Sequence, residues 1–91
     1  MNRVELNQTV AQAAEITQAQ AKAAVDTALE AIVAAVAAGD RVQLPGFGTF
    51  ESRERSARTG RNPRTGEELA IAASVAPAFK PASAFKERVA R

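Results

Sequence analysis

The residues of this chain best suited to chemistry are arginines that gather between positions 51 and 66. This stretch has no large apolar side chain, so it has almost nothing to bury and cannot build a core. Residues 42–50 before it and 69–79 after it have strand-like sequences, so the stretch should protrude as an arm. Guanidinium groups at this density favour binding to the phosphates of a polyanion. These arginines are Arg53, Arg55, Arg58, Arg61 and Arg64.

The charge of the chain is distributed unevenly. The formal net charge is only +2. Residues 1–40 contain two basic and five acidic side chains, whereas residues 41–91 contain ten basic and five acidic ones. The first segment therefore has a net charge of −3 and the second a net charge of +5. This asymmetry predicts a local polyanion-binding surface that the total charge conceals.

The composition offers little for catalysis or metal binding. The 91 residues include no Cys and no His, so disulfides, the commonest metal ligand and the commonest general base are all missing. We therefore predict no metal, no cofactor and no enzymatic activity, with a nuclease that uses carboxylates and Mg²⁺ as one alternative. Four glutamates near the arm could form a metal cluster, but pairing with arginines across a ribbon is the favoured interpretation. They are Glu51, Glu54, Glu67 and Glu68.

Two capping signatures mark the starts of two predicted helices. Asn2 is followed three residues later by Glu5, and Thr17 is followed in the same way by Gln20. In a capping box, each side chain of such a pair bonds to the backbone N–H of the other residue. The first helix should therefore span about residues 3–15, and the second should begin after Thr17.

The second helix is expected to run to residue 38 and stop at Gly39, because glycine is common just beyond a helix C-terminus. Residues 31–38 carry no charge on any face, and a helix end that is apolar all round is normally buried all round. In a chain with four aromatic residues and no disulfide, a second subunit is the expected cover. The residues predicted for the dimer core are Leu29, Ile32, Val36, Leu44, Phe47, Phe50 and Phe79.

Beyond the second helix the apolar period changes to two, which predicts a sheet. Alternation begins at Val42, Pro45–Gly46 should form a turn or a bulge, and the strand should resume at Phe47. The arm should extend over about residues 53–74, with its tip at residues 62–66, and its return leg should continue as a strand towards the sheet.

The whole chain is predicted to form one α+β domain, because 91 residues leave no room for two cores. A short helix should close it. Its three parts would be a helical dimerisation base at residues 1–40, a sheet with the arm at residues 41–81, and a C-terminal helix within residues 82–91.

Two runs of residues resemble a family signature. Residues 46–50 (GFGTF) and 59–66 (TGRNPRTG), with arginines between them, resemble the HU and integration-host-factor proteins, small bacterial nucleoid proteins that bind and bend DNA. The similarity extends over the whole chain. It implies an intertwined dimer, most similar to HU, with a helical base, a three-stranded antiparallel sheet from each subunit, and two β-ribbon arms that wrap the duplex.

The resemblance also implies roles for individual residues. Pro63 would wedge between base steps in the minor groove, as this family is known to do, with Arg61 and Asn62 beside it. Many relatives have Gly-Lys where this chain has Ala82–Ser83, and some have Lys where it has Gln18, which implies weaker contacts from the body. The DNA-binding residues implied are Arg3, Arg53, Arg55, Arg58, Arg61, Asn62, Pro63, Arg64, Lys80 and Lys86.

The expected function is that of an architectural protein: a homodimer that bends and compacts double-stranded DNA with little sequence specificity and favours distorted DNA. No helix is basic enough to read base edges in the major groove. A sequence-specific heterodimer of the integration-host-factor type and a module that binds an acidic protein are alternatives, and RNA binding is left open. With no leader or membrane-spanning run in the sequence, a soluble, cytoplasmic and nucleoid-associated protein is expected.

Overall fold

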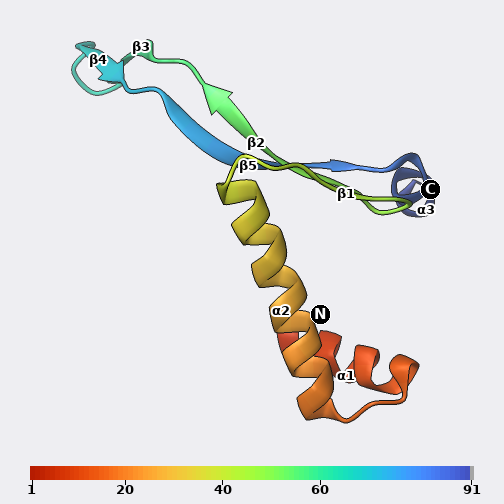
Figure 1. Ribbon diagram of the computed structural model, residues 1–91. Helices are drawn as coiled ribbons and strands as arrows, with labels where there is room; N and C mark the ends of the chain where they lie inside the picture. The colour runs from red at the N-terminus through yellow and green to blue at the C-terminus, as the bar shows by residue number, and fades with distance from the viewer. Residues whose placement is uncertain (91) are drawn as a thin grey trace. The chain divides into compact units, whose positions relative to one another are not determined.

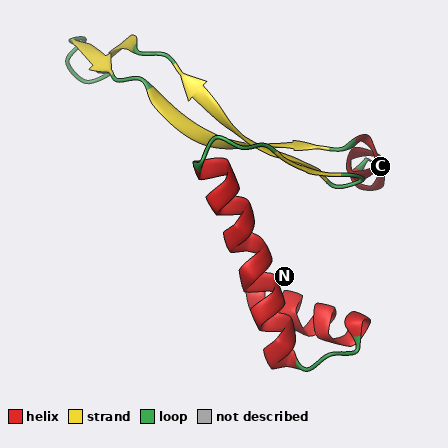
Figure 2. Ribbon diagram, in the orientation of Figure 1, coloured by secondary structure: helices red, strands yellow, loops and turns green. Residues whose placement is uncertain are grey.

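The computed structural model describes residues 1–90 and confirms the α+β class (Figures 1 and 2). The chain forms two compact units, Met1–Ala34 and the part from Ala35 onward. Arg91, which the predicted C-terminal segment includes, lies outside the described residues. The elements are α1 (Arg3–Ala14), α2 (Gln18–Ala37), β1 (Val42–Leu44), β2 (Gly48–Arg55), β3 (Arg58–Arg61), β4 (Glu68–Ile71), β5 (Ser74–Pro81) and α3 (Ser83–Val89).

Of the two predicted capping boxes, the first is present in half and the second is complete. The Oδ1 atom of Asn2 accepts a hydrogen bond from the backbone N–H of Glu5 at 2.9 Å. At the start of α2, Thr17 Oγ1 accepts from the N–H of Gln20 at 3.1 Å, and Gln20 Oε1 accepts from the N–H of Thr17 at 3.0 Å. The second pair is therefore a complete reciprocal box, which satisfies backbone donors that a helix leaves without partners.

Gly39 ends α2 as predicted, although the helix stops one residue earlier than expected, at Ala37. Gly39 has φ +89, and its N–H donates to the carbonyl of Val36 at 3.0 Å. The N–H of Asp40 donates to the carbonyl of Ala35 at 2.9 Å. These two bonds form a Schellman motif, which requires a left-handed residue at the glycine position.

The first helix also ends one residue early, at Ala14, because Glu15 adopts the left-handed conformation with φ 56. The N–H of Glu15 and that of Ile16 both donate to the carbonyl of Ala11. A residue with a side chain pays a steric cost there that glycine would not. Two backbone hydrogen bonds to Ala11 thus hold the α1–α2 connection in place, with Glu15 in a strained conformation.

The sheet has the strand order β1-β2-β5 and is antiparallel throughout. A turn joins β1 to β2, in which the N–H of Phe47 donates to the carbonyl of Leu44 at 3.0 Å. Pro45 followed by Gly46 with φ +79 is the sequence of a type II turn. Because Phe47 belongs to this turn, the second strand begins at Gly48, one residue later than predicted.

Four phenylalanines gather at the end of the sheet that meets α3. The rings of Phe50 and Phe79 are directly cross-strand, with centroids 4.7 Å apart, and the Phe47 centroid lies 5.5 Å from Phe79 and 5.4 Å from Phe85. Such tilted and edge-on pairs are favourable arrangements for aromatic rings. Phe85, absent from the predicted dimer core, belongs to this cluster.

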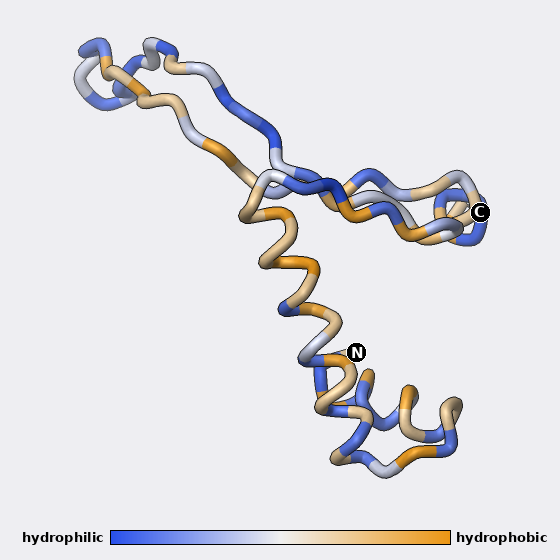
Figure 3. Tube along the Cα trace, viewed as in Figure 1, coloured by the Kyte–Doolittle hydropathy of each residue, from blue (hydrophilic) through white to orange (hydrophobic). Residues whose placement is uncertain are grey.

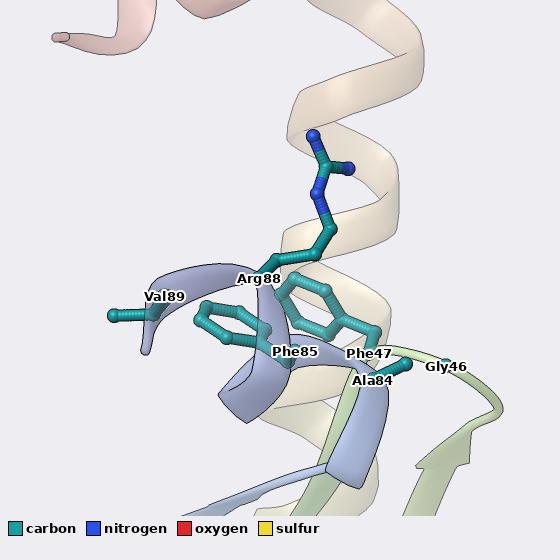
Figure 4. Close-up of a pocket in the computed structure, with 6 residues that line it drawn as sticks. All are labelled: Gly46, Phe47, Ala84, Phe85, Arg88 and Val89. Atoms are coloured by element: carbon teal, nitrogen blue, oxygen red, sulfur yellow. The ribbon is translucent and has the colours of Figure 1, made fainter. Parts of the chain in front are cut away.

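The aromatic cluster is open on one side. A cavity of about 460 Å³ is bordered by Phe47 and Phe85, whose rings lie next to each other in an edge-on arrangement (Figure 4), while the Arg88 guanidinium points away from them. Phe47 is 45% exposed and Phe79 is 38% exposed. Among residues 1–90 the buried apolar side chains are only Ala11 and Ala21, so a single chain leaves its large apolar residues incompletely covered.

Gly48 is the residue that permits the close contact between β2 and β5. A Cβ atom added to it would lie 2.5 Å from Phe79 Cε1 and 2.6 Å from the carbonyl oxygen of Lys80. We expect Gly48→Ala to destabilise the fold by about 1–3 kcal/mol, because the added methyl group overpacks this site. The measurement is urea unfolding at one fixed protein concentration.

A Phe79→Leu background provides the control for this substitution. Leucine removes the ring from the space above Gly48, so Gly48→Ala should cost less there than in the native background. A loss of less than about 0.5 kcal/mol in the native background would show that the strands separate easily at Gly48.

Candidate nucleic-acid interface

The arm consists of two separate antiparallel ladders rather than one continuous ribbon. The β2–β5 ladder extends to the pair Arg55–Ser74, and the β3–β4 ladder begins at the pair Arg58–Ile71. Residues 56–57 on one leg and residues 72–73 on the other belong to neither ladder. The prediction of an uninterrupted return leg is therefore wrong. These four residues are Ser and Ala, which have weak strand propensity.

The two legs of the arm differ in chemistry. The outgoing leg carries Arg53 and Arg55 in β2 and Arg58 and Arg61 in β3. The return leg has no cation before Lys80. It has instead three large apolar residues that are 39–66% exposed, and Figure 3 shows this difference along the trace. These residues are Leu69, Ile71 and Val75.

Within β2, the arginines lie on the polar face of the sheet. Arg53 is opposite Ala76, and Arg55 is opposite Ser74. Because side chains alternate between faces, these small cross-strand neighbours share the face of the arginines and leave the guanidinium groups uncovered. Both arginines are exposed, so they are accessible to phosphate.

The tip of the arm is a closed loop. The N–H of Asn62 donates to the carbonyl of Glu67 at 2.8 Å, and the N–H of Gly66 donates to the carbonyl of Asn62 at 2.8 Å. Gly66 has φ +76, which its lack of a side chain permits. Pro63 and Arg64 are exposed within this loop. The residues predicted at the tip are thus assembled in one turn.

Glu51 gathers three cations on the polar face of the sheet. Its carboxylate lies 3.0 Å from the Nζ of Lys80, 3.3 Å from the Nε of Arg41 and 3.8 Å from an Nη of Arg53. Arg41 directly precedes β1, next to the pair Val42–Phe50, and so lies opposite Glu51, whereas Lys80 is diagonal to Glu51 on β5. The carboxylate side chain is only 13% exposed, while each cation keeps more than half of its side-chain surface exposed.

The hydrogen bond from Lys80 lowers the pKa of Glu51, and the charges of Lys80, Arg41 and Arg53 add to this effect against the opposing effect of burial. The carboxylate therefore remains ionised at neutral pH. Three cations and one carboxylate give this group a net charge of +2. We call these four residues the Glu51 cluster. It leaves the polar face attractive to phosphate while holding its cations in place.

Arg3 has an acidic partner in the helical unit. Its guanidinium lies 2.7 Å from one carboxylate oxygen of Asp26, and the Nζ of Lys22 lies 2.7 Å from the other. The hydrogen bond from Lys22, followed by that from Arg3, lowers the pKa of Asp26. Arg3 keeps 53% of its side-chain surface exposed, so this pairing orients the guanidinium without covering it.

The remaining predicted residues are placed as follows. Lys86 is exposed on α3 and has no acidic partner within 4.0 Å among residues 1–90. Glu54, Glu67 and Glu68 likewise form no ion pair within residues 1–90, so the prediction that they pair with arginines across the ribbon is wrong for these three. Glu51 does pair with two arginines, but Arg41 lies just before β1 and Arg53 lies on the same strand, so these pairs do not cross the ribbon. The described residues contain no grouping of three or more acidic side chains able to hold a metal ion.

Arg41 is the residue of the Glu51 cluster that the sequence interpretation missed. The sequence did contain a signal for Arg41. Side chains alternate along a strand, so a residue next to the apolar Val42 should lie on the polar face. Its pairing with Glu51 depends on the register of β1 on β2, which the sequence does not specify. Among the described residues, no helix has both the length and the apolar character needed to cross a membrane.

A small antiparallel sheet that extends into an arginine-rich ribbon with proline at its tip defines a class of proteins that hold a polyanion with a β-arm. The model of the family "Bacterial DNA-binding protein" matches residues 1–90. The chain therefore belongs to this bacterial DNA-binding protein family.

Similar proteins agree with this assignment. The chain is 54% identical over 90 residues to DNA-binding protein HU 1 of Bacillus subtilis, covering 99% of this chain and 98% of the relative. It is 52% identical over 89 residues to DNA-binding protein HU of Haemophilus influenzae, covering 98% and 99% respectively. A cocrystal structure of Anabaena HU with DNA matches with a TM-score of 0.91 and 52% identity, over 99% of this chain and 98% of that one.

The Glu51 cluster predicts how stability depends on pH. A carboxylate whose pKa is lowered by folding stabilises the native state at neutral pH, and this contribution is lost as pH falls through the folded pKa. Glu51→Gln should therefore lose less stability than the native protein between about pH 6 and pH 3. Urea midpoints measured across this range at fixed protein concentration provide the check.

Glu54→Gln is the matched control, because Glu54 is on the same strand and forms no ion pair within residues 1–90. It should keep the native pH profile. If Glu51→Gln and Glu54→Gln gave the same profile, the Glu51 cluster would not contribute to acid unfolding.

Proposed function

We propose that two copies of this chain form a dimer that binds double-stranded DNA in the minor groove with little sequence specificity, and that bends and condenses it. The observation that carries this proposal is family membership over residues 1–90, together with a cationic arm built as the resemblance implies. A structural relative of the chain, Anabaena HU, is described in complex with DNA. The setting proposed for this activity is the bacterial nucleoid.

The dimer is supported by the apolar surface that one chain leaves uncovered. Leu29, Leu44, Phe47 and Phe79 are each 37–45% exposed in the single chain. Ile32, Val36 and Phe50 are half-buried. A partner that covered these seven side chains would supply the missing core by removing apolar area from water. We propose that these residues form the dimer core, to which Phe85 adds a ring.

The arm is proposed to grip the duplex through its outgoing leg. Arg55, Arg58, Arg61 and Arg64 have no acidic partner within 4.0 Å among residues 1–90, so phosphate would meet them without competition. Arg53 and Lys80 would contact phosphate from the Glu51 cluster, and Arg3 and Lys86 would contact the flanking DNA. Pro63 would enter a base step, and the wrapped contacts would offset an unstacking cost known for this family to be a few kcal/mol.

The arrangement favours low sequence specificity. The minor groove distinguishes mainly A·T from G·C pairs, and the exposed arm residues are suited to phosphate and groove shape rather than to a base code. The relatives described above are named HU, which favours a homodimer of that type over a heterodimer of the integration-host-factor type. We propose no catalytic activity, and recovery of intact DNA after incubation with Mg²⁺ tests this point.

The first test compares a labelled linear duplex with the same duplex carrying a nick or two unpaired bases, across a salt series. Tighter binding to the distorted duplex and a steep salt dependence are expected, because bending an already flexible site costs less. Equal and weak binding to both duplexes would contradict the proposal and would direct the search to an acidic protein partner.

The double variant Arg55→Gln/Arg58→Gln tests the cationic leg. It should weaken binding to all duplex sequences and reduce the slope of log affinity against log salt by about two, which is about one for each lost phosphate contact. Arg55→Lys/Arg58→Lys retains both charges and should largely preserve the slope. An unchanged slope in the glutamine variant would exclude these two residues as phosphate contacts.

A further inference from the structure

Asn62 uses both its backbone and its side chain to build the arm tip. Its N–H and its carbonyl form the two closing bonds with Glu67 and Gly66, each at 2.8 Å. Its side-chain Oδ1 accepts a third bond from the backbone N–H of Arg64 at 2.9 Å. A fourth, weaker bond within the loop joins Thr65 Oγ1 to the N–H of Glu67 at 3.3 Å.

The side chain of Asn62 is engaged inside the loop, while its neighbours are exposed. Asn62 is half-buried, whereas Pro63 and Arg64 are exposed. The bond from Arg64 to Oδ1 spans Pro63, which has no N–H of its own and so cannot be fixed by a donor bond. An Asn oxygen that bonds two residues onward mimics a backbone turn and restricts the residue between.

We propose that Asn62 is a positioning residue for Pro63: its Oδ1 holds the loop in the shape that presents the proline ring for insertion into a base step. This inference rests on the proposed function, and it replaces the expected contact of Asn62 with the groove by an action through Pro63. If the tip is already ordered in the free protein, less conformational entropy is lost when Pro63 inserts into the DNA.

The two roles considered for Asn62 use different atoms of its side chain: positioning uses the acceptor Oδ1, and direct contact with the groove would use the donor Nδ2. The minor groove presents mainly acceptors, so a direct contact by Asn62 would need its Nδ2–H donor. Aspartate keeps an acceptor oxygen at the same place and lacks that donor, whereas alanine lacks both. Asn62→Asp should therefore preserve the positioning role, and Asn62→Ala should remove it.

The experiment measures the bend of a duplex labelled at both ends by energy transfer, at protein concentrations that saturate each variant. Saturation removes the effect that the aspartate charge has on affinity. We expect Asn62→Ala to bend DNA as little as Pro63→Ala does, and Asn62→Asp to restore the native bend. The double variant Asn62→Ala/Pro63→Ala should bend DNA as much as either single variant does, because both residues act through the same step, the insertion of Pro63.

The outcomes distinguish this inference from the proposed function. If the native protein did not bind or bend the duplex, the proposed function would fail. If the native protein bent DNA and Asn62→Ala bent it equally, only the positioning role would be overturned. Equal loss of the bend in Asn62→Asp and Asn62→Ala would also overturn it, in favour of a donor contact from Nδ2. Unchanged thermal unfolding of both variants would show that the body of the protein is intact.

Discussion

The structure depends on a shortage of apolar burial within one chain. Only small side chains are buried in residues 1–90, and the aromatic rings beside α3 remain open on one side. Such a chain has too little hydrophobic stabilisation to offset the entropy of ordering a long arm. The proposed association of two chains would resolve this shortage, and it would allow a large share of the sequence to serve binding rather than core formation.

The same sheet serves stability and binding because its two faces have different chemistry. On one face, Phe50 pairs with Phe79 and extends the aromatic cluster. On the other, Glu51 holds a cation from β2, one from β5 and one from the residue just before β1. The carboxylate reduces repulsion among these cations in the free protein. The binding face is thus positively charged and ordered before any ligand arrives, which reduces the entropy lost on association.

Much of the fold could be predicted because its signals are local. The capping pairs, the glycine after α2, the turn at Pro45–Gly46 and the arm tip each depend on residues within a few positions of one another. The missed features depend on register or side-chain direction. Arg41 lies near Glu51 only because of the register of β1 on β2. The break between the two ladders requires both legs of the arm to lose pairing at opposite positions. The Asn62 side chain bonds within the loop through Oδ1, although the sequence would equally allow it to point towards the DNA groove.

The break between the two ladders has a mechanical consequence. Residues 56–57 and 72–73 contribute no ladder hydrogen bonds, so the distal ribbon can rotate relative to the proximal one without breaking any. The position of the tip is then not rigidly tied to the orientation of the sheet. If the chain binds DNA as proposed, this joint would let one arm fit duplexes that differ in local twist or groove width, without selecting among their sequences.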